Sequence, residues 1–422
     1  MEERQKALLV GANLNNKSDF KESMEELCNL AIACDFEVVG EIVQNLKSTN
    51  NSHYIGTGKV KEVLSLLEEH QSDVVIFNNE LTPSQLRNLE KTLKCRILDR
   101  TALILEIFAQ RAKTHEAKLQ VEVTNLKYML PRLMGSREEL GRQGGGVGTK
   151  NKGVGEKKIE LDRRKIEERI VALNKELENI VFQRQTQRKR RNKRDLPLVS
   201  LVGYTNAGKS TVMNGMIDTF KNSDDKKVFE KDMLFATLET SVRSIILPDN
   251  KNFLLSDTVG FVSNLPHDLI KAFRSTLEEV CEADLLIHVV DFSNPNYKHQ
   301  IEVTIDTLNQ IGAGDIPVIY AYNKVDLVEG PITEEKNHSV FISAKKKIGM
   351  DNLIKLISQK VFTDYVHCEM LIPYDKGDVV SYLREKTNVK SIKYESNGTL
   401  LALECSKVDY VKYEEFIIAH EL

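Results

Sequence analysis

The segment GYTNAGKS at residues 203–210 constrains the fold of this chain more than any other part of the sequence. It fits the pattern G-x-x-x-x-G-K-[ST] at every fixed position, follows the apolar run LPLVSLV and precedes STVMNGMI, which can form a helix. A strand, a glycine-rich loop and a helix in this order allow backbone N–H groups and the helix N-terminus to surround a phosphate group. The sequence therefore predicts an α/β domain with a phosphate-binding loop.

Two side chains of this loop suit separate tasks in nucleotide binding. Lys209 is expected to reach the β- and γ-phosphate oxygens, and Ser210 to coordinate Mg²⁺. The glycines allow the main chain to wrap closely around the β-phosphate. The predicted nucleotide contacts of the loop are Gly203, Tyr204, Thr205, Asn206, Ala207, Gly208, Lys209, Ser210 and Thr211.

Further motifs follow, each at the end of an apolar, strand-like run. In DTVG (257–260), Asp257 is expected to contact Mg²⁺ through water and the Gly260 N–H to sense the γ-phosphate. In NKVD (323–326), the Asp326 carboxylate can accept hydrogen bonds from both N1–H and the exocyclic amine of guanine. Adenine offers neither donor in that arrangement, so this motif selects GTP over ATP.

The base site is completed by two further groups. Lys324 is expected to lie along the base plane, and Ser343-Ala344-Lys345 could present the Ala344 N–H to guanine O6. Four motifs at strand ends, in this order, indicate a GTPase domain. Beyond the glycine loop, the predicted nucleotide site consists of Asp257, Thr258, Val259, Gly260, Asn323, Lys324, Val325, Asp326, Ser343, Ala344 and Lys345.

A switch segment is expected between the first two motifs. The stretch KVFEKDMLFATLETSVR contains several hydroxyl residues, one of which must close over the γ-phosphate to complete the Mg²⁺ shell. Thr237 is the preferred residue, while the pattern alone leaves Thr240 and Ser241 open. Ser210, Thr237 and Asp257 are therefore the predicted metal ligands.

Phe261 stands directly after D-x-x-G, where Ras-like GTPases have a glutamine that orients the attacking water. A phenyl ring can neither donate nor accept that hydrogen bond. Intrinsic hydrolysis is therefore expected to be slow, with water positioned by another group or by a partner. Lys209, Thr237, Gly260 and Phe261 are the residues assigned to catalysis.

The remaining sequence divides into three parts beside the predicted GTPase domain at 195–362. Residues 1–100 alternate strand-like runs with amphipathic segments, one of them capped by Thr82-Pro83, and predict a small α/β domain. Residues 101–194 carry two apolar stripes at helical spacing, which can bury each other only as an antiparallel hairpin. Residues 363–422 predict a small α+β domain with a hairpin around Asn397-Gly398.

The hairpin tip, GRQGGGVGTKNKGVG (141–155), has seven glycines among fifteen residues but lacks the G-K-[ST] ending and does not follow a strand. It suits close backbone approach to RNA rather than to a nucleotide. The second helix is expected to end in a basic run at 184–194, with seven Lys or Arg and no acid. A glycine turn and a solvated linker without contacts are the alternatives. The predicted RNA contacts are Arg142, Gln143, Lys150, Lys152, Arg188, Lys189, Arg190 and Arg191.

No run of about 18 apolar residues is present, so no membrane span is expected. The N-terminus MEERQKALLV has no apolar segment of signal-peptide length. A cytoplasmic protein is therefore expected. The sequence leaves the oligomeric state open, with a monomer as the default.

The chain resembles the HflX family of ribosome-associated GTPases. The resemblance rests on YIGTGKV, DRTALILEIFAQRAKTHEAKLQVE, KYMLPRL, GGGVGTK, LDRR, GYTNAGKSTVMN, LFATLE and SDTVGFVSNLP, and runs from about residue 4 to the end. It implies that Phe235, Ala236, Thr237, Leu238 and Glu239 form the guanine-nucleotide switch, with Thr237 as Mg²⁺ ligand. It also implies that the protein binds the large ribosomal subunit, with the hairpin tip near the peptidyl-transferase region, and with GTP splits or rescues stalled ribosomes.

Two departures from the family pattern suggest a divergent paralogue. Family members usually continue GPGETQ after GGGVGTK, whereas this chain has NKGVGEKK, and the family's DPT after FATL is Glu239-Thr240-Ser241 here. Stress response and antibiotic resistance stay open as physiological roles, whether in heat, in dormancy or against ribosome-targeting antibiotics. Two other functions stay open: an ATP-dependent RNA remodeller that uses the loop Gly56–Lys59, and a nucleotide-gated scaffold that binds a protein.

Overall fold

A computed structural model describes residues 4–15, 19–134, 152–192, 196–220, 241–263, 279–328 and 338–420. By their contacts these residues form two compact units. The first contains the described residues up to 189 together with Val259–Ser263, and the second contains those of 190–258 and 279–420. Each unit is described by itself below.

The N-terminal sheet of the first unit is parallel, with strand order β2-β1-β3-β4. Its strands are β1 (Lys6–Leu14), β2 (Glu37–Leu46), β3 (Val74–Phe77) and β4 (Arg96–Asp99). The helices of this unit are α1 (Phe20–Ala33), α2 (Thr57–His70), α3 (Pro83–Leu93), α4 (Arg100–Arg111), α5 (His115–Met134) and α7 (Lys152–Asn192).

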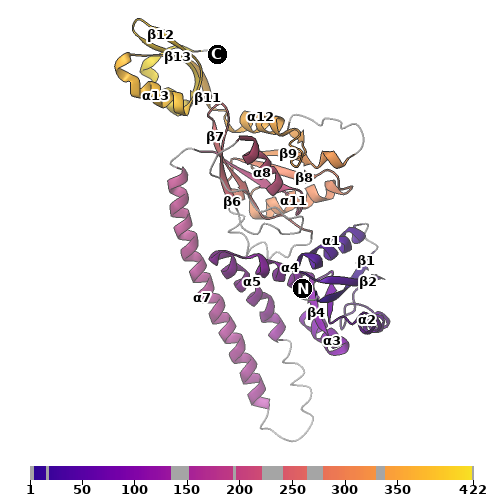
Figure 1. Cartoon of the computed structure of the whole chain (residues 1–422). Helices are drawn as coiled ribbons and strands as arrows, with labels where there is room; N and C mark the ends of the chain where they lie inside the picture. Colours follow the sequence, from indigo (N-terminus) through magenta and orange to yellow (C-terminus); the bar gives the residue numbers. More distant parts are fainter. Residues whose placement is uncertain are drawn as a thin grey trace. The chain divides into compact units, whose positions relative to one another are not determined.

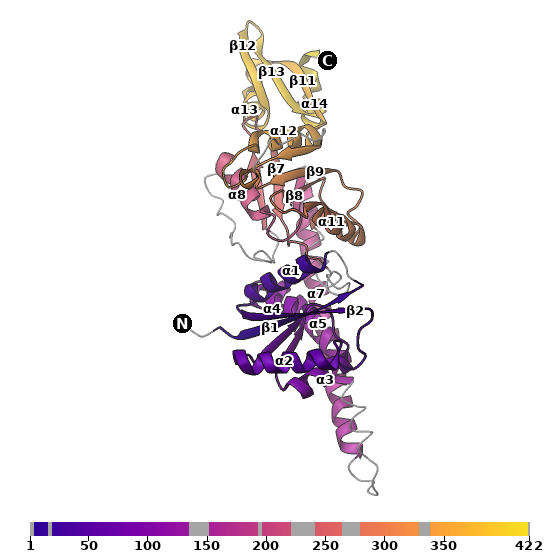
Figure 2. The ribbon, with the colours of Figure 1, turned by 90° about the vertical axis from the view of Figure 1, so that its right-hand side faces the viewer.

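Alternating residues of β1 show how the sheet is buried on both faces. Ala7 and Leu9 belong to the core formed with α1 and α4, whereas Leu8 and Val10 belong to the core formed with α2 and α3. Figure 2 shows α2 and α3 together on one face of this sheet. Burial on both faces is the normal state of a parallel sheet and explains the near-continuous apolar strands.

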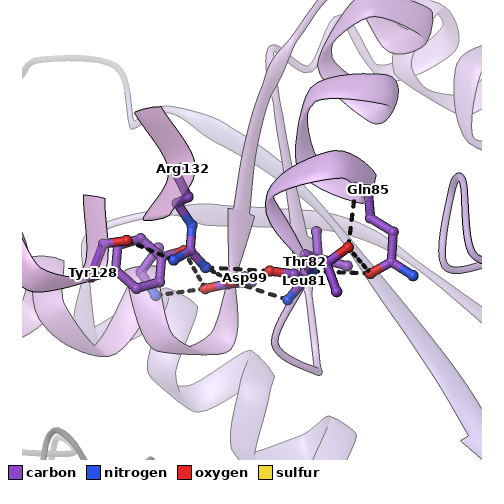
Figure 3. A network of polar contacts seen from close by, with 7 residues as sticks. Leu81, Thr82, Gln85, Asp99, Tyr128 and Arg132 are labelled. Atoms are coloured by element: carbon purple, nitrogen blue, oxygen red, sulfur yellow. Dashed lines mark hydrogen bonds and ion pairs between the residues drawn. The ribbon is translucent and has the colours of Figure 1, made fainter. Parts of the chain in front are cut away.

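A buried carboxylate joins strand β4 to the helices that follow it. Asp99, the last residue of β4, is completely buried and accepts hydrogen bonds from the Leu81 N–H (3.1 Å) and the Ala102 N–H (2.8 Å). Its oxygens also accept from Tyr128 Oη (2.7 Å) and Arg132 Nη2 (2.9 Å), both on α5 (Figure 3). Asp99 thereby ties the C-terminal part of α5 to the end of β4.

Helices α5 and α7 form the predicted hairpin and run side by side in Figure 1. The side-chain contact His115–Glu176 (2.7 Å) and the ion pair Glu122–Arg169 (2.8 Å) join them, so residue numbers rise along one helix as they fall along the other. The buried stripe between the helices consists of Leu119, Val123 and Leu173, with Leu126, Ile170, Leu177 and Ile180 packed around it.

The second unit contains a six-stranded sheet of order β10-β9-β8-β5-β7-β6, in which only β6 is antiparallel to its neighbour. The strands are β5 (Leu198–Val202), β6 (Ser241–Ile246), β7 (Asn252–Asp257), β8 (Leu285–Asp291), β9 (Val318–Asn323) and β10 (Ser339–Phe341). Its helices are α8 (Lys209–Phe220), α11 (Tyr297–Ile311), α12 (Met350–Val361) and the 3₁₀ turn η1 (Val325–Leu327).

The same unit ends in a small antiparallel sheet of order β12-β13-β11-β14. It consists of β11 (Tyr365–Ile372), α13 (Gly377–Lys386), β12 (Asn388–Glu395), β13 (Gly398–Ser406), α14 (Lys407–Lys412) and β14 (Ile417–His420), with 3₁₀ turns η2 (Tyr374–Lys376) and η3 (Glu414–Phe416). The predicted hairpin is present but its turn is Ser396-Asn397, and Gly398 already belongs to β13. A Cβ on Gly398 would lie 2.4 Å from the Ile372 carbonyl oxygen, so glycine serves close strand packing here.

Across the described residues, no helix is both long and apolar enough to cross a membrane. The fold class predicted from the sequence is confirmed: a P-loop α/β domain accompanies an N-terminal α/β domain, a helical hairpin and a small C-terminal α+β domain. The domain boundaries at 100, 194 and 362 stay a prediction.

Candidate functional site

The glycine loop joins β5 to α8, as its sequence predicts. Gly203 has a φ of +142°, and a Cβ there would lie 2.2 Å from the Val289 carbonyl oxygen of β8. Gly208 has a φ of +94°, and its Cβ would lie 2.3 Å from Asn323 Nδ2. Both positions therefore require glycine for conformation and for space.

Lys209 opens α8 and is almost fully buried. Its ammonium group donates hydrogen bonds to the carbonyl oxygens of Gly203 (3.1 Å) and Tyr204 (2.8 Å), so the side chain folds back over the loop. Burial lowers the pKa of Lys209 to about 8, while the nearby Asp257 carboxylate acts in the opposite direction. Phosphate charges brought by a nucleotide would favour the protonated form.

The two described residues predicted to serve the metal lie together. Ser210 Oγ donates a hydrogen bond to Asp257 Oδ2 at 2.6 Å, although the residues are 47 positions apart. A hydroxyl and a carboxylate beside phosphate oxygens are the ligands that Mg²⁺ prefers. Thr258 fixes the DTVG segment to the central strand, because its Oγ1 donates to the Leu201 carbonyl oxygen at 2.6 Å.

Asn323 connects three of the four motifs through one side chain. Its Nδ2 donates to the Ala207 carbonyl oxygen (2.9 Å) in the glycine loop, and its Oδ1 accepts from the Ala344 N–H (3.0 Å). The Ser343 segment is itself closed by a pair of backbone hydrogen bonds with Ile348, each 3.0 Å long. The loop, the NKVD motif and the 343–345 segment therefore form one connected structure.

Two carboxylates lie at the NKVD motif. The pKa of Asp326 is lowered, chiefly by a hydrogen bond from Ser343 and also by Lys346, whose Nζ lies 3.6 Å away. Lys324 has a left-handed φ of +65° and pairs with Asp291 Oδ2 at 2.7 Å. Asp291 was not among the predicted site residues, although it lies at the end of the apolar run DLLIHVVD, which was the available signal.

The chain passes from the second unit to the first between Thr258 and Val259. Val259 and Val262 are buried in the core that α1 and α4 form. The Ser263 carbonyl accepts from Arg100 Nη2 (3.1 Å), and its N–H donates to Glu26 Oε1 (3.3 Å). Gly260 and Phe261, both buried, lie in this segment.

Several predicted residues lie outside the described part of the chain. These are the switch residues Phe235, Ala236, Thr237, Leu238 and Glu239, the alternative Thr240, and the tip residues Arg142, Gln143 and Lys150. The backbones of Lys152, Arg188, Lys189, Arg190 and Arg191 belong to α7, while their side chains are not described. Ser241, the other alternative, is the first residue of β6.

Two polar groups of the loop Gly56–Lys59 are engaged by neighbouring side chains. The Gly56 N–H donates to Gln44 Oε1 (2.9 Å), and Lys59 Nζ pairs with Glu62 Oε2 (2.8 Å). Gly56 serves as the N-cap of α2. These contacts favour a role in starting the helix over a second phosphate site.

Comparison with known families identifies all three parts before the C-terminal domain. Residues 21–109 match "GTP-binding GTPase N-terminal", residues 111–191 match "GTP-binding GTPase Middle Region", and residues 198–324 match "50S ribosome-binding GTPase". The GTPase HflX of Caldanaerobacter subterraneus is 42% identical over 417 residues, which cover 99% of this chain and 95% of the relative. The chain belongs to the HflX family of GTPases.

Other HflX proteins align over nearly the same length. The GTPase HflX of Escherichia coli K12 is 36% identical over 402 residues, covering 94% of this chain and 92% of that protein. A GTP-binding protein from Sulfolobus solfataricus, solved in complex with GDP, is 25% identical with a TM-score of 0.45 and covers 84% of this chain and 98% of its own.

Family membership confirms the resemblance inferred from the motifs and the predicted GTPase activity. This HflX-family protein binds guanine nucleotides and hydrolyses GTP. The individual roles assigned to its site residues stay predictions.

Proposed function

We propose that this HflX GTPase binds the large ribosomal subunit and, in its GTP-bound form, splits or rescues stalled ribosomes. The observation that carries the proposal is the match of residues 198–324 to the family described as "50S ribosome-binding GTPase". That match lies within a chain that aligns with HflX proteins over nearly its whole length. A cytoplasmic location follows from this function.

In the proposed site, Lys209 contacts the β- and γ-phosphates. Ser210 and Thr237 would hold Mg²⁺ directly and Asp257 through water, where the ion would neutralise charge that develops on the phosphate oxygens. The Ser210–Asp257 hydrogen bond of 2.6 Å supports this grouping of oxygen ligands. Asp326 accepts from the guanine N–H groups and Lys324 lies along the base. The Ala344 N–H would reach guanine O6 only by leaving Asn323 Oδ1, to which it donates at 3.0 Å in this structure.

Phe261 provides no group that could orient water, so the ribosome is the proposed source of efficient hydrolysis. Replacing Phe261 with Gln or Ala tests whether the Phe261 side chain contributes to basal hydrolysis. Only a small change in the basal rate is expected, because the ring contributes no hydrogen bond. A large fall in basal rate would show that Phe261 does contribute to hydrolysis.

The hairpin is the proposed contact with ribosomal RNA. Its antiparallel helices α5 and α7 support a long projection, and its glycine-rich sequence at 141–155 carries basic residues without any acid. Glycine allows close backbone approach to RNA, while Lys and Arg meet phosphates.

Splitting is tested by light scattering of intact 70S ribosomes mixed with the protein. GTP or a non-hydrolysable analogue should lower the scattering, and GDP should not. A variant in which residues 141–155 are shortened to a Gly-Ser turn should fail to split while retaining its basal GTPase rate. Unchanged scattering with the wild type and GTP would reject the splitting role, and splitting by the shortened variant would reject the tip as RNA contact.

A further inference from the structure

We propose that Asp291 is a positioning residue for guanine recognition: its carboxylate holds Lys324 in place along the base. The inference rests on the proposed site in which Lys324 contacts the nucleotide base. It assigns a role to a residue outside the four nucleotide-binding motifs.

The sheet brings the two residues together. Asp291 is the last residue of β8, and in the parallel register of β8 and β9 it stands opposite Asn323, the first residue of the NKVD motif. The carboxyl ends of both strands therefore meet at one edge, where ligands bind in open α/β sheets. Asp291 Oδ2 lies 2.7 Å from Lys324 Nζ across this edge.

The carboxylate is itself held in one orientation. Its Oδ1 accepts from the Ser293 N–H (3.1 Å) and from Ser293 Oγ (2.5 Å), which leaves Oδ2 directed to Lys324. The side chains of Asp291 and Lys324 are 17% and 25% exposed. A charge-assisted hydrogen bond between such largely buried side chains is stronger than one between fully solvated groups.

The backbone next to Asp291 is also fixed to the NKVD strand. The Phe292 N–H donates to the Asn323 carbonyl oxygen at 3.0 Å. The Phe292 ring packs on Tyr322 and Phe341, with centroids 5.6 and 5.2 Å away. The position from which Asp291 acts is therefore set by packing.

A lysine that is to lie along a nucleotide base benefits from a carboxylate partner that holds its ammonium group. Its ammonium group is carried on a flexible four-carbon stem, and the freedom of that stem would be lost on nucleotide binding. A stem already held by Asp291 has lost part of this freedom before the base arrives, which favours binding. The same gain applies to GTP and GDP because both carry guanine.

The test is Asp291→Asn, which keeps the size of the side chain but removes its charge. Dissociation constants for fluorescent GDP and GTP analogues should both rise about tenfold, the order expected when a charge-assisted hydrogen bond is weakened. In steady-state kinetics of GTP hydrolysis, the substitution should raise KM and leave kcat unchanged. Asp306→Asn, at an exposed position on α11, changes the charge of the chain equally and should leave both constants unchanged.

A double-mutant cycle separates positioning from a general structural effect. Lys324→Met keeps an unbranched stem without the ammonium group, so adding Asp291→Asn to it should weaken binding no further. The inference is overturned if Asp291→Asn binds GDP as the wild type does. It is equally overturned if the substitution costs the same factor in the Lys324→Met background.

A third variant distinguishes this inference from the site on which it rests. Asp326→Asn should shift preference from GTP to XTP, because xanthine has a carbonyl oxygen where guanine has its amine. Without that shift, the proposed base site fails altogether. If Asp326→Asn shifts the preference to XTP while Asp291→Asn leaves GDP and GTP affinity unchanged, only the positioning role of Asp291 is contradicted.

Discussion

At the scale of single residues, the nucleotide site depends on side chains and glycines that each satisfy several neighbours. Asn323 joins the glycine loop to the Ala344 backbone, and Gly208 leaves the space that the Asn323 amide fills. Removing either should disturb several motifs together, because the hydrogen bonds share one side chain.

The pair Gly208→Ala and Gly312→Ala separates loss of space from loss of conformational freedom. Both glycines have positive φ, +94° and +86°, but only a Cβ at Gly208 would meet another atom, Asn323 Nδ2 at 2.3 Å. Each substitution should lower the free energy of unfolding by about 1–2 kcal/mol through the left-handed backbone. Only Gly208→Ala should also weaken GDP binding, by at least about tenfold.

Measuring chemical denaturation and GDP affinity for both variants checks this expectation. Equal GDP affinity for the two alanine variants would show that the contact between loop and Asn323 is not needed for binding.

Lys209 should make nucleotide affinity and protein stability respond to pH in opposite directions. Its pKa of about 8 lies below the ordinary lysine value, so the unfolded chain binds more protons than the folded protein between pH 8 and about 10.5. Stability from this group should therefore rise across that range. Phosphates raise the pKa again, so GDP affinity should fall above pH 8, by up to about tenfold per pH unit.

Titrating GDP binding from pH 7 to 10 checks the sign, with Lys209→Arg as the control. Arginine stays charged throughout, so its affinity should stay nearly flat over the same range. If the GDP affinity of the wild type instead rises with pH, a protonated Lys209 is excluded as the phosphate contact.

At the scale of elements, local signals predicted most of what the structure contains. The Thr82–Pro83 cap is present, with Thr82 accepting from the Gln85 N–H, because capping depends only on neighbouring residues. The glycine loop was predictable for the same reason. The Asp291–Lys324 pair was not predictable, because it depends on β8 lying beside β9. Neither segment by itself indicates which strands are neighbours in the sheet.

The buried Asp99 group should be the main anchor of α5. The substitution Asp99→Asn should remove the ion pair with Arg132 and weaken the hydrogen bond from Tyr128 (Figure 3). Breaking a buried ion pair by removing one charge costs about 3–5 kcal/mol. Glu106→Gln, which breaks the more exposed pair with Arg96, should cost less than about 1 kcal/mol.

Amide hydrogen exchange in β4 and α5 measures these two costs separately from the rest of the chain. Similar protection of α5 in the Asp99→Asn and Glu106→Gln variants would contradict the anchoring role of Asp99.

At the scale of the whole molecule, one short segment packs with a compact unit other than that of the motif it follows. Val259–Ser263 follow the Asp257 motif directly but pack with the N-terminal unit. The predicted GTPase domain at 195–362 includes this segment because the segment is contiguous with the nucleotide-binding motifs. Burial of Val259 and Val262 in the α1–α4 core is a tertiary effect that no local period reveals.

Val262→Ala should therefore destabilise the first unit, although its position in the sequence lies among GTPase motifs. Loss of two buried carbons and the cavity left behind cost about 2 kcal/mol. Hydrogen exchange should increase in α1 and α4, whereas Val340→Ala should increase it in the second unit, where Val340 is buried. Faster exchange confined to the second unit in Val262→Ala would contradict this assignment.

The proposal that this HflX GTPase acts on the ribosome is tested most directly by its GTP hydrolysis rate with and without purified large ribosomal subunits. We expect a slow basal rate, because Phe261 cannot orient water, and strong stimulation by the subunits. The variant shortened at residues 141–155 should keep the basal rate and lose most of the stimulation. A wild-type rate that the subunits leave unchanged would contradict a ribosome-activated GTPase.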